Sequence, residues 1–150
     1  MTNSDWGIAR LRPSGRYGFV NAGWTLDAYP ELDTLNAGHA MKVAELEGPG
    51  VIHRLHITQH ALPPAILESH RLTAADARAL VSRGVVFEVY YNGCKTPSVR
   101  VPLGDFFLDG CGGRGGHYST IYLEAGTESY NCFIPMPFKN GIRIQLVNET

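Results

Sequence analysis

Four acidic residues, Asp105, Asp109, Glu124 and Glu128, lie at expected strand ends or loops in the part of the chain richest in glycine and aromatic residues. A glycosidase needs a pair of carboxylates, held about 5–5.5 Å apart for retention or about 6.5–9.5 Å apart for inversion. Asp105, Asp109 and Glu128 are therefore candidate acids for glycoside hydrolysis. Asp105 follows a glycine, where an aspartate often caps its own turn, so a structural role for Asp105 is the favoured interpretation.

The segment from Gly110 to His117 reads Gly-Cys-Gly-Gly-Arg-Gly-Gly-His. Glycine-rich loops bind phosphate when they lead into a helix, but a strand is expected from Tyr118, so the context does not predict a phosphate site. The simpler expectation is a loop at one end of the fold. The alternative is a loop ordered by a ligand or a neighbouring subunit, with Arg114, His117 and Tyr118 as polar contacts.

Cys111 and His117 lie in the same segment and invite comparison with a nucleophile and its base. A reactive cysteine needs a lowered thiol pKa, which a rigidly held imidazolium or a helix N-terminus supplies. A glycine loop supplies neither, and no third orienting group is evident. Cysteine catalysis is therefore not predicted.

Three histidines, His53, His56 and His60, are close enough in sequence to suggest a metal site. Side chains alternate along a strand, which places His53 and His56 on opposite faces and His56 and His60 about 13 Å apart. One metal ion binds its ligands at about 2 Å, so surface or inter-subunit histidines are favoured. The sequence predicts no metal and no cofactor.

The composition of the 150 residues is that of an ordinary globular domain, with a formal net charge of −1. The basic residues are scattered, unlike the clustered Lys and Arg of nucleic-acid-binding proteins, so no nucleic-acid partner is predicted. Three cysteines without a CxxC pair favour reduced thiols and a cytoplasmic location. No signal-peptide pattern and no run of about 20 apolar residues is visible, so no membrane association is expected.

The elements that must position these residues are short strands separated by turn signals. Strands are expected at Lys42–Glu47, Val51–Thr58, Val85–Tyr91, Val99–Pro102, Tyr118–Glu124, Tyr130–Ile134 and Ile142–Asn148. One short helix is expected at about 73–83, because Thr73 and Asp76 form a capping-box pattern. The fold class predicted is all-β: a single jelly-roll antiparallel β-sandwich at 41–150 with one inserted helix, preceded by an extended N-terminal arm at 1–40.

Two segments combine an apolar strand with prolines and aromatic residues: 97–107, which reads PSVRVPLGDFF, and 130–138, which reads YNCFIPMPF. Proline lacks a backbone donor, so such strands are expected at sheet edges, bulges or strand starts. With Gly-Pro-Gly-Val-Ile at 48–52, these motifs resemble, in the same order, the N-terminal half of glycoside hydrolase family 172, formerly domain-of-unknown-function family 2961. The resemblance covers roughly residues 40–150.

The resemblance implies a jelly-roll sandwich. Full-length relatives carry two jelly rolls in one chain, assemble as trimers or hexamers, and hydrolyse α-D-fructofuranosyl or D-arabinofuranosyl linkages with retention. Their catalytic glutamates lie in the second half, in motifs resembling Gly-Glu-Gly-Asp-Glu and Gly-Thr-Gly-Thr-Glu-Asp-Tyr, and this chain ends before either motif. The nearest similar segment here, 126–130, lies where the family's first half has a non-catalytic turn, so no catalytic role is transferred to Glu128.

We therefore expect a structural or assembly protein that is inactive alone. Its partners would be further copies in a trimeric or hexameric ring, held by the arm at 1–40, or a separate C-terminal jelly-roll chain. One alternative is a furanoside hydrolase whose site is completed by another subunit, with Asp105, Asp109 or Glu128 as acids. Another is a carbohydrate-binding module that uses tyrosines as stacking platforms. The tyrosines considered for that role are Tyr118, Tyr122 and Tyr130.

Overall fold

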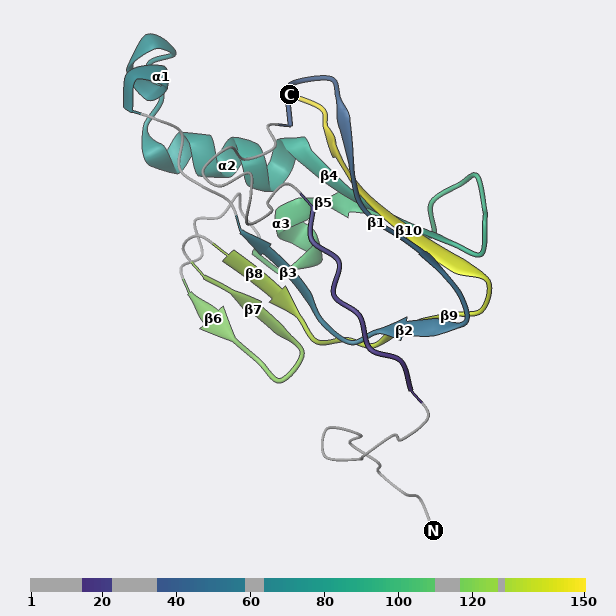
Figure 1. Cartoon of the computed structure of the whole chain (residues 1–150). Helices are drawn as coiled ribbons and strands as arrows, with labels where there is room; N and C mark the ends of the chain where they lie inside the picture. The colour runs from purple at the N-terminus through teal and green to yellow at the C-terminus, as the bar shows by residue number, and fades with distance from the viewer. Residues whose placement is uncertain (1–14, 23–34, 59–63, 110–116, 127–128) are drawn as a thin grey trace.

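The computed structural model describes residues 15–22, 35–58, 64–109, 117–126 and 129–150, and its strands form three antiparallel sheets (Figure 1). Sheet A has the order β1 (Ala40–Glu47), β10 (Gly141–Asn148), β4 (Val85–Tyr91) and β5 (Val99–Pro102). Sheet B pairs β2 (Gly50–Ile52) with β9 (Met136–Phe138). Sheet C has the order β3 (Leu55–Thr58), β8 (Ser129–Cys132), β7 (Leu123–Ala125) and β6 (Tyr118–Ser119). The prediction of an antiparallel all-β fold is confirmed.

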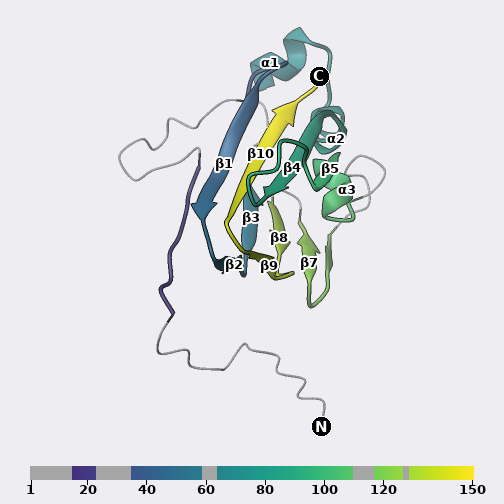
Figure 2. The ribbon, with the colours of Figure 1, turned by 90° about the vertical axis from the view of Figure 1, so that its right-hand side faces the viewer.

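One antiparallel ribbon runs through all three sheets. The consecutive strands β1, β2 and β3 pair in turn with β10, β9 and β8. Figures 1 and 2 show β2 and β9 at the bend between the two larger sheets. The remaining strands extend the two larger sheets. The pair β4 and β5 continues sheet A beyond β10, and the pair β7 and β6 continues sheet C beyond β8. The ribbon therefore ties residues 40–58 to residues 129–148 through three successive strand pairs.

Alternate residues of the two larger sheets fill one apolar core. In β10, Ile142, Ile144 and Leu146 are buried while Arg143 and Gln145 are only partly covered, as the alternation in the sequence predicts. At the centre, ring centroids lie 4.4 Å apart between Phe87 and Phe106, 5.0 Å between Phe106 and Phe107, and 4.9 Å between Phe107 and Tyr130. This chain of rings links sheet A to sheet C, and such aromatic contacts add to the energy of burial.

The helix expected at 73–83 is present as α2 (Ala74–Gly84), and it begins with the predicted capping box. The Asp76 N–H donates to Thr73 Oγ1 at 3.1 Å, and the Thr73 N–H donates to Asp76 Oδ2 at 3.0 Å. Ser82 of α2 is fully buried against Gly104. A Cβ at position 104 would lie 1.8 Å from Ser82 Oγ, so this contact requires glycine.

Two further helices, α1 (Pro64–Ser69) and α3 (Leu103–Phe106), are not predicted from the sequence. The prolines of 97–107 predicted only a strand at a sheet edge, a bulge or a strand start, with no helix after it. The helical turn instead places Leu103 and Phe107, at 2% and 0% exposure, in the core together, because residues four apart share one face of a helix.

Turn and proline residues behave as their chemistry predicts. Asn92 and Gly93, at the end of β4, have φ angles of 55° and 76°, the left-handed pair of a tight hairpin turn. The Asn92 Oδ1 also accepts from the N–H groups of Lys139 and Asn140, at 3.1 Å and 2.8 Å. The proline-containing strands are edges: β5 ends sheet A, and β9 belongs to the two-stranded sheet B.

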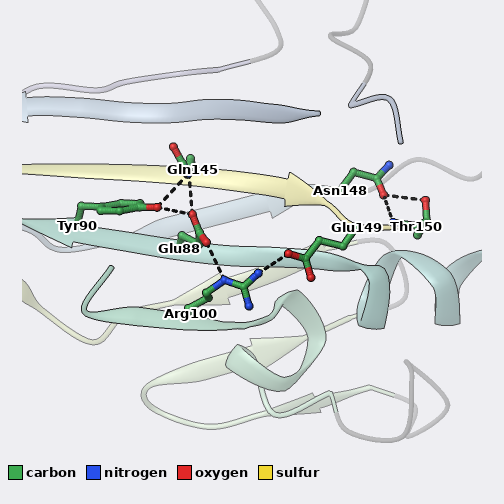
Figure 3. A network of polar contacts seen from close by, with 7 residues as sticks. All are labelled: Glu88, Tyr90, Arg100, Gln145, Asn148, Glu149 and Thr150. Carbon is green, nitrogen blue, oxygen red and sulfur yellow. Dashed lines mark hydrogen bonds and ion pairs between the residues drawn. The ribbon is translucent and has the colours of Figure 1, made fainter. Parts of the chain in front are cut away.

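A polar network covers the outer face of sheet A (Figure 3). Glu88 of β4, only 6% exposed, accepts from the Tyr90 hydroxyl and from Gln145 Nε2, each at 2.6 Å, and from Arg100 Nε at 3.0 Å. Arg100 also pairs with Glu149 near the chain end. Burial alone would raise the pKa of the Glu88 carboxyl, but the three donors outweigh it and the pKa is lowered.

Within the predicted N-terminal arm, residues 15–22 are strongly exposed, whereas Leu35 packs against the core and Ala40 begins β1. Tyr17, Phe19 and Val20 are 76%, 88% and 50% exposed. The division into an arm at 1–40 and a domain at 41–150 remains a prediction. Across the described ranges, no helix has the length and apolar character needed to span a membrane.

Candidate functional site

Asp109, one of the candidate acids, is placed by a tight turn after α3. Leu108 has a φ of 58°, and the Asp109 N–H donates to the Gly104 carbonyl at 2.8 Å. The side chain of Asp109 is thereby buried, with the residue 2% exposed. The Tyr130 hydroxyl donates to Asp109 Oδ2 at 2.6 Å, and Arg78 Nη2 lies 3.7 Å from the same oxygen. A carboxylate from a turn, a tyrosine from β8 and an arginine from α2 therefore meet under the surface.

Several polar atoms here retain spare hydrogen-bonding capacity. Arg78 Nε, Asp109 Oδ1 and the Tyr118 hydroxyl are buried without a partner within the described ranges. Burial, together with the negative charge of Asp109, raises the pKa of Tyr118. A buried polar group left unpaired costs about 1–3 kcal/mol, and such groups commonly hold an ordered water. We call Arg78, Asp109, Tyr118 and Tyr130 the Asp109 cluster.

Asp105, the second candidate acid, has a different environment. It lies on α3 and pairs with Arg83 in the last turn of α2. The two side chains are 33% and 52% exposed, so water screens the pair. Asp105 thus joins two helices at the surface and is not part of the Asp109 cluster.

His117, predicted as a contact of the glycine-rich loop, lies at the entry to β6. Its Nε2 atom is 3.5 Å from Glu124 Oε1, and the side chains are 61% and 35% exposed. Tyr118 follows it, but the Tyr118 hydroxyl is buried in the Asp109 cluster. The structure therefore separates the neighbours His117 and Tyr118 onto the outer and inner sides of sheet C.

The other predicted residues of this region lie outside the described residues. These are Arg114 of the ligand or interface loop, the weak catalytic candidate Glu128, the thiol Cys111, and His60. Of the remaining histidines, His56 contacts Asn131 Oδ1 and Thr58 Oγ1, both at 2.9 Å. Among the residues that the structure describes, no three His, Cys, Asp or Glu side chains are grouped to hold a metal ion.

The three tyrosines considered as sugar platforms differ sharply in exposure. Tyr122 is 49% exposed. Tyr130 is completely buried, so the expectation that it presents a ring face to a sugar is wrong. Tyr130 lies on the inward-facing side of β8, and its ring stacks on the Phe107 ring with 4.9 Å between the ring centroids.

Sequence reasoning missed Arg78 and Asn131. Arg78 follows the buried Ala77 on α2, and its Nη2 donates to the Gly126 carbonyl at 2.8 Å, which connects α2 to sheet C. Asn131 is 7% exposed, between two inward residues of β8. The capping box predicts where α2 begins, but it does not reveal that Arg78 points toward sheet C, because that orientation depends on tertiary packing.

A family model described as GH172 domain-like matches residues 30–150. The chain belongs to the GH172 domain-like family. The match contains every strand from β1 to β10 and the whole Asp109 cluster, and it confirms the resemblance drawn from the proline and aromatic motifs. Comparison with curated proteins gives no match. The GH172 domain therefore relates this chain to glycoside hydrolases.

Proposed function

We propose that this GH172 domain is a non-catalytic assembly module, inactive alone on furanosides, whose partner is a second copy of the same chain. The environments of the candidate acids Asp105 and Asp109 support the proposal that the isolated chain has no hydrolase activity. The Asp109 side chain is buried and accepts a hydrogen bond from the Tyr130 hydroxyl. Asp105 forms an ion pair with Arg83. Retaining hydrolysis needs two carboxylates on either side of an accessible sugar, and these two are engaged in holding α2, α3 and β8.

The observation that carries the assembly role is the exposed aromatic segment at 15–22. Phe19 and Tyr17 are the most exposed large apolar residues among those described, at 88% and 76%. Apolar groups exposed to this degree on an extended segment are typical of protein contacts. Sheet A also ends in β1, and an extended segment from another copy could add to such an edge by backbone hydrogen bonds.

Two finer predictions belong to this proposal. The jelly-roll form of the sandwich is supported by the ribbon of β1–β2–β3 with β10–β9–β8, which crosses from sheet A to sheet C. The cytoplasmic location is supported by the odd number of cysteines and by Cys94, which is free and exposed.

The test is the mass of the full chain in solution, measured by light scattering over a range of concentrations. We expect a closed oligomer, and a smaller species for the double variant Tyr17→Ser/Phe19→Ser. Leu80→Ser, at an exposed position of α2, is the matched control and should keep the oligomer. A monomeric wild-type chain, or an oligomer that the double variant leaves intact, would contradict the proposal.

The alternative is an enzyme completed by another subunit or by a separate C-terminal sandwich. Such an enzyme would need acidic groups from that partner, because Asp109 is 2% exposed and Asp105 is paired with Arg83. Hydrolysis of an aryl α-D-arabinofuranoside or α-D-fructofuranoside by the purified chain, abolished in Asp109→Asn or Glu128→Gln, would replace the assembly proposal with this one.

A further inference from the structure

The outer face of sheet C presents an ordered array of side chains, fixed by the strand register. Leu55, Leu123, Tyr130 and Cys132 are buried in the core, so their neighbours along each strand face outward. Across the sheet the register aligns one polar row. From β3 to β6 it contains His56, Asn131, Glu124 and Ser119.

A second row lies one step further along the same face. The Phe133 N–H donates to the Tyr122 carbonyl at 2.8 Å, which places these two residues opposite each other beyond the Leu123–Cys132 pair. Phe133 and Tyr122 are 39% and 49% exposed as whole residues. The Arg54 guanidinium lies 5.7 Å from the centre of the Phe133 ring. We call the polar row and this aromatic row together the sheet C face.

The polar row is held in place by its own contacts. Asn131 Oδ1 accepts from Arg54 Nη2 at 3.0 Å and contacts His56 Nδ1 at 2.9 Å, and Asn131 Nδ2 donates to Glu124 Oε2 at 3.1 Å. The other carboxylate oxygen of Glu124, Oε1, faces His117, with 3.5 Å between Oε1 and His117 Nε2. Arg54 has further N–H groups and Glu124 further lone pairs beyond these bonds. The row is therefore ordered in advance and still able to bond a ligand, which lowers the entropy lost on binding.

The chemistry of the sheet C face indicates the class of ligand. Its one arginine and one glutamate cancel in charge, which disfavours a strongly charged ligand. Exposed aromatic rings beside a carboxylate, an amide and a guanidinium combine an apolar platform with planar hydrogen-bonding groups. A neutral sugar needs both, because its ring has an apolar C–H face and a rim of hydroxyl groups.

We infer that the sheet C face is a binding site for a neutral oligosaccharide, with Tyr122 and Phe133 as the stacking platform and Glu124 and Arg54 as hydrogen-bonding groups. The buried Asn131 is a positioning residue that holds Glu124 and Arg54 in place. The site lies outside the Asp109 cluster, on the opposite side of sheet C. It is independent of the assembly proposed for the arm, since a ring formed through residues 15–22 does not require these side chains.

The test uses the full chain, labelled with ¹⁵N and titrated separately with cellohexaose, xylohexaose, mannohexaose and α-1,5-arabinohexaose. At least one of these neutral oligosaccharides should shift the amide signals of β7 and β8 and those of residues 122 and 133. Tyr122→Ala and Phe133→Ala should each weaken binding about tenfold. Tyr122→Phe should restore most of the affinity, and Tyr17→Ala, an exposed aromatic control outside the face, should bind like the wild type.

Three results would overturn the inference. The first is that none of the four oligosaccharides perturbs β7 and β8, and the second is that binding survives in Tyr122→Ala/Phe133→Ala. Neither of these affects the mass measurement of the assembly proposal, so the two proposals fail separately. The third is that the same amides shift with protein concentration in the absence of sugar, since a second copy of the chain would then be the occupant. In the mass measurement such a contact would give an oligomer that Tyr17→Ser/Phe19→Ser leaves intact.

Discussion

Two aspartates four positions apart in the sequence have opposite environments in the fold. The turn at Leu108, with its φ of 58°, sends Asp109 into the core side of sheet C, where it meets Tyr130 and Arg78. Asp105 remains on α3 at the surface, beside Arg83. The sequence marked both as candidate acids, because residue type and spacing do not reveal whether a carboxylate ends in water or under a sheet.

This difference gives a matched pair of substitutions. Asp109→Ala should lower the free energy of unfolding by about 3–5 kcal/mol, because it removes the buried carboxylate that accepts from the Tyr130 hydroxyl and faces the Arg78 guanidinium. Asp105→Ala should cost at most about 1 kcal/mol, since its ion pair is exposed to solvent. Urea denaturation of the two variants and the wild type measures both values. Equal losses would show that the Asp109 cluster does not hold the fold together.

At the scale of elements, α2 links sheet A to sheet C. Its buried residues pack toward β4 and α3, while Arg78 bonds to the Gly126 carbonyl beyond β7. The helix has 11 residues, which is too short to be stable in isolation. Its stability therefore depends on its N-cap and on these tertiary contacts.

Thr73→Ala should destabilise the protein by about 1 kcal/mol, because it removes the acceptor for the Asp76 N–H. Thr73→Ser keeps the hydroxyl and should stay within a few tenths of a kcal/mol of the wild type. Thermal unfolding followed by circular dichroism checks both variants. A loss as large for serine as for alanine would mean that the threonine methyl group matters more than the cap.

The elements with a local chemical signature could be predicted from the sequence. The capping box at Thr73, the Asn92–Gly93 turn and the alternation in β10 all appear as expected. The helix α3 could not be predicted, because the burial of Leu103 and Phe107 that favours it depends on tertiary packing against α2, β4, β5 and the Tyr130 ring of β8. The same limit hid the pairing of Asn131 with Arg54 and His56, which depends on the register of β3 with β8.

At the scale of the whole molecule, sheet A is held together on both faces. The inner face packs into the core through residues such as Phe87 and Ile144. On the outer face the Glu88 network connects β4, β5, β10 and the residues after β10 (Figure 3). β10 lies between β1 and β4 in this sheet, so a loss of the network weakens the junction of β10 with β4 and β5.

The lowered pKa of Glu88 makes this junction sensitive to acid. The pKa of Glu88 in the unfolded chain is the ordinary 4.5, and folding lowers it. Just below pH 4.5 the unfolded chain therefore takes up a proton at Glu88, whereas the folded protein keeps the carboxyl ionised. The unfolded state then binds more protons, so the stabilisation is complete above about pH 4.5 and is lost as the pH falls through the folded pKa.

Glu88→Gln should therefore lose about 1–3 kcal/mol of unfolding free energy near pH 7 and show a shallower decline between about pH 5 and pH 3 than the wild type. Urea titrations at several pH values measure both effects. Glu45→Gln is the control, because Glu45 also has a lowered pKa, through Lys42, but its ion pair is exposed on β1. If Glu45→Gln flattened the acid decline as much as Glu88→Gln, the sensitivity would arise from surface charge in general and not from the network that joins β4, β5 and β10.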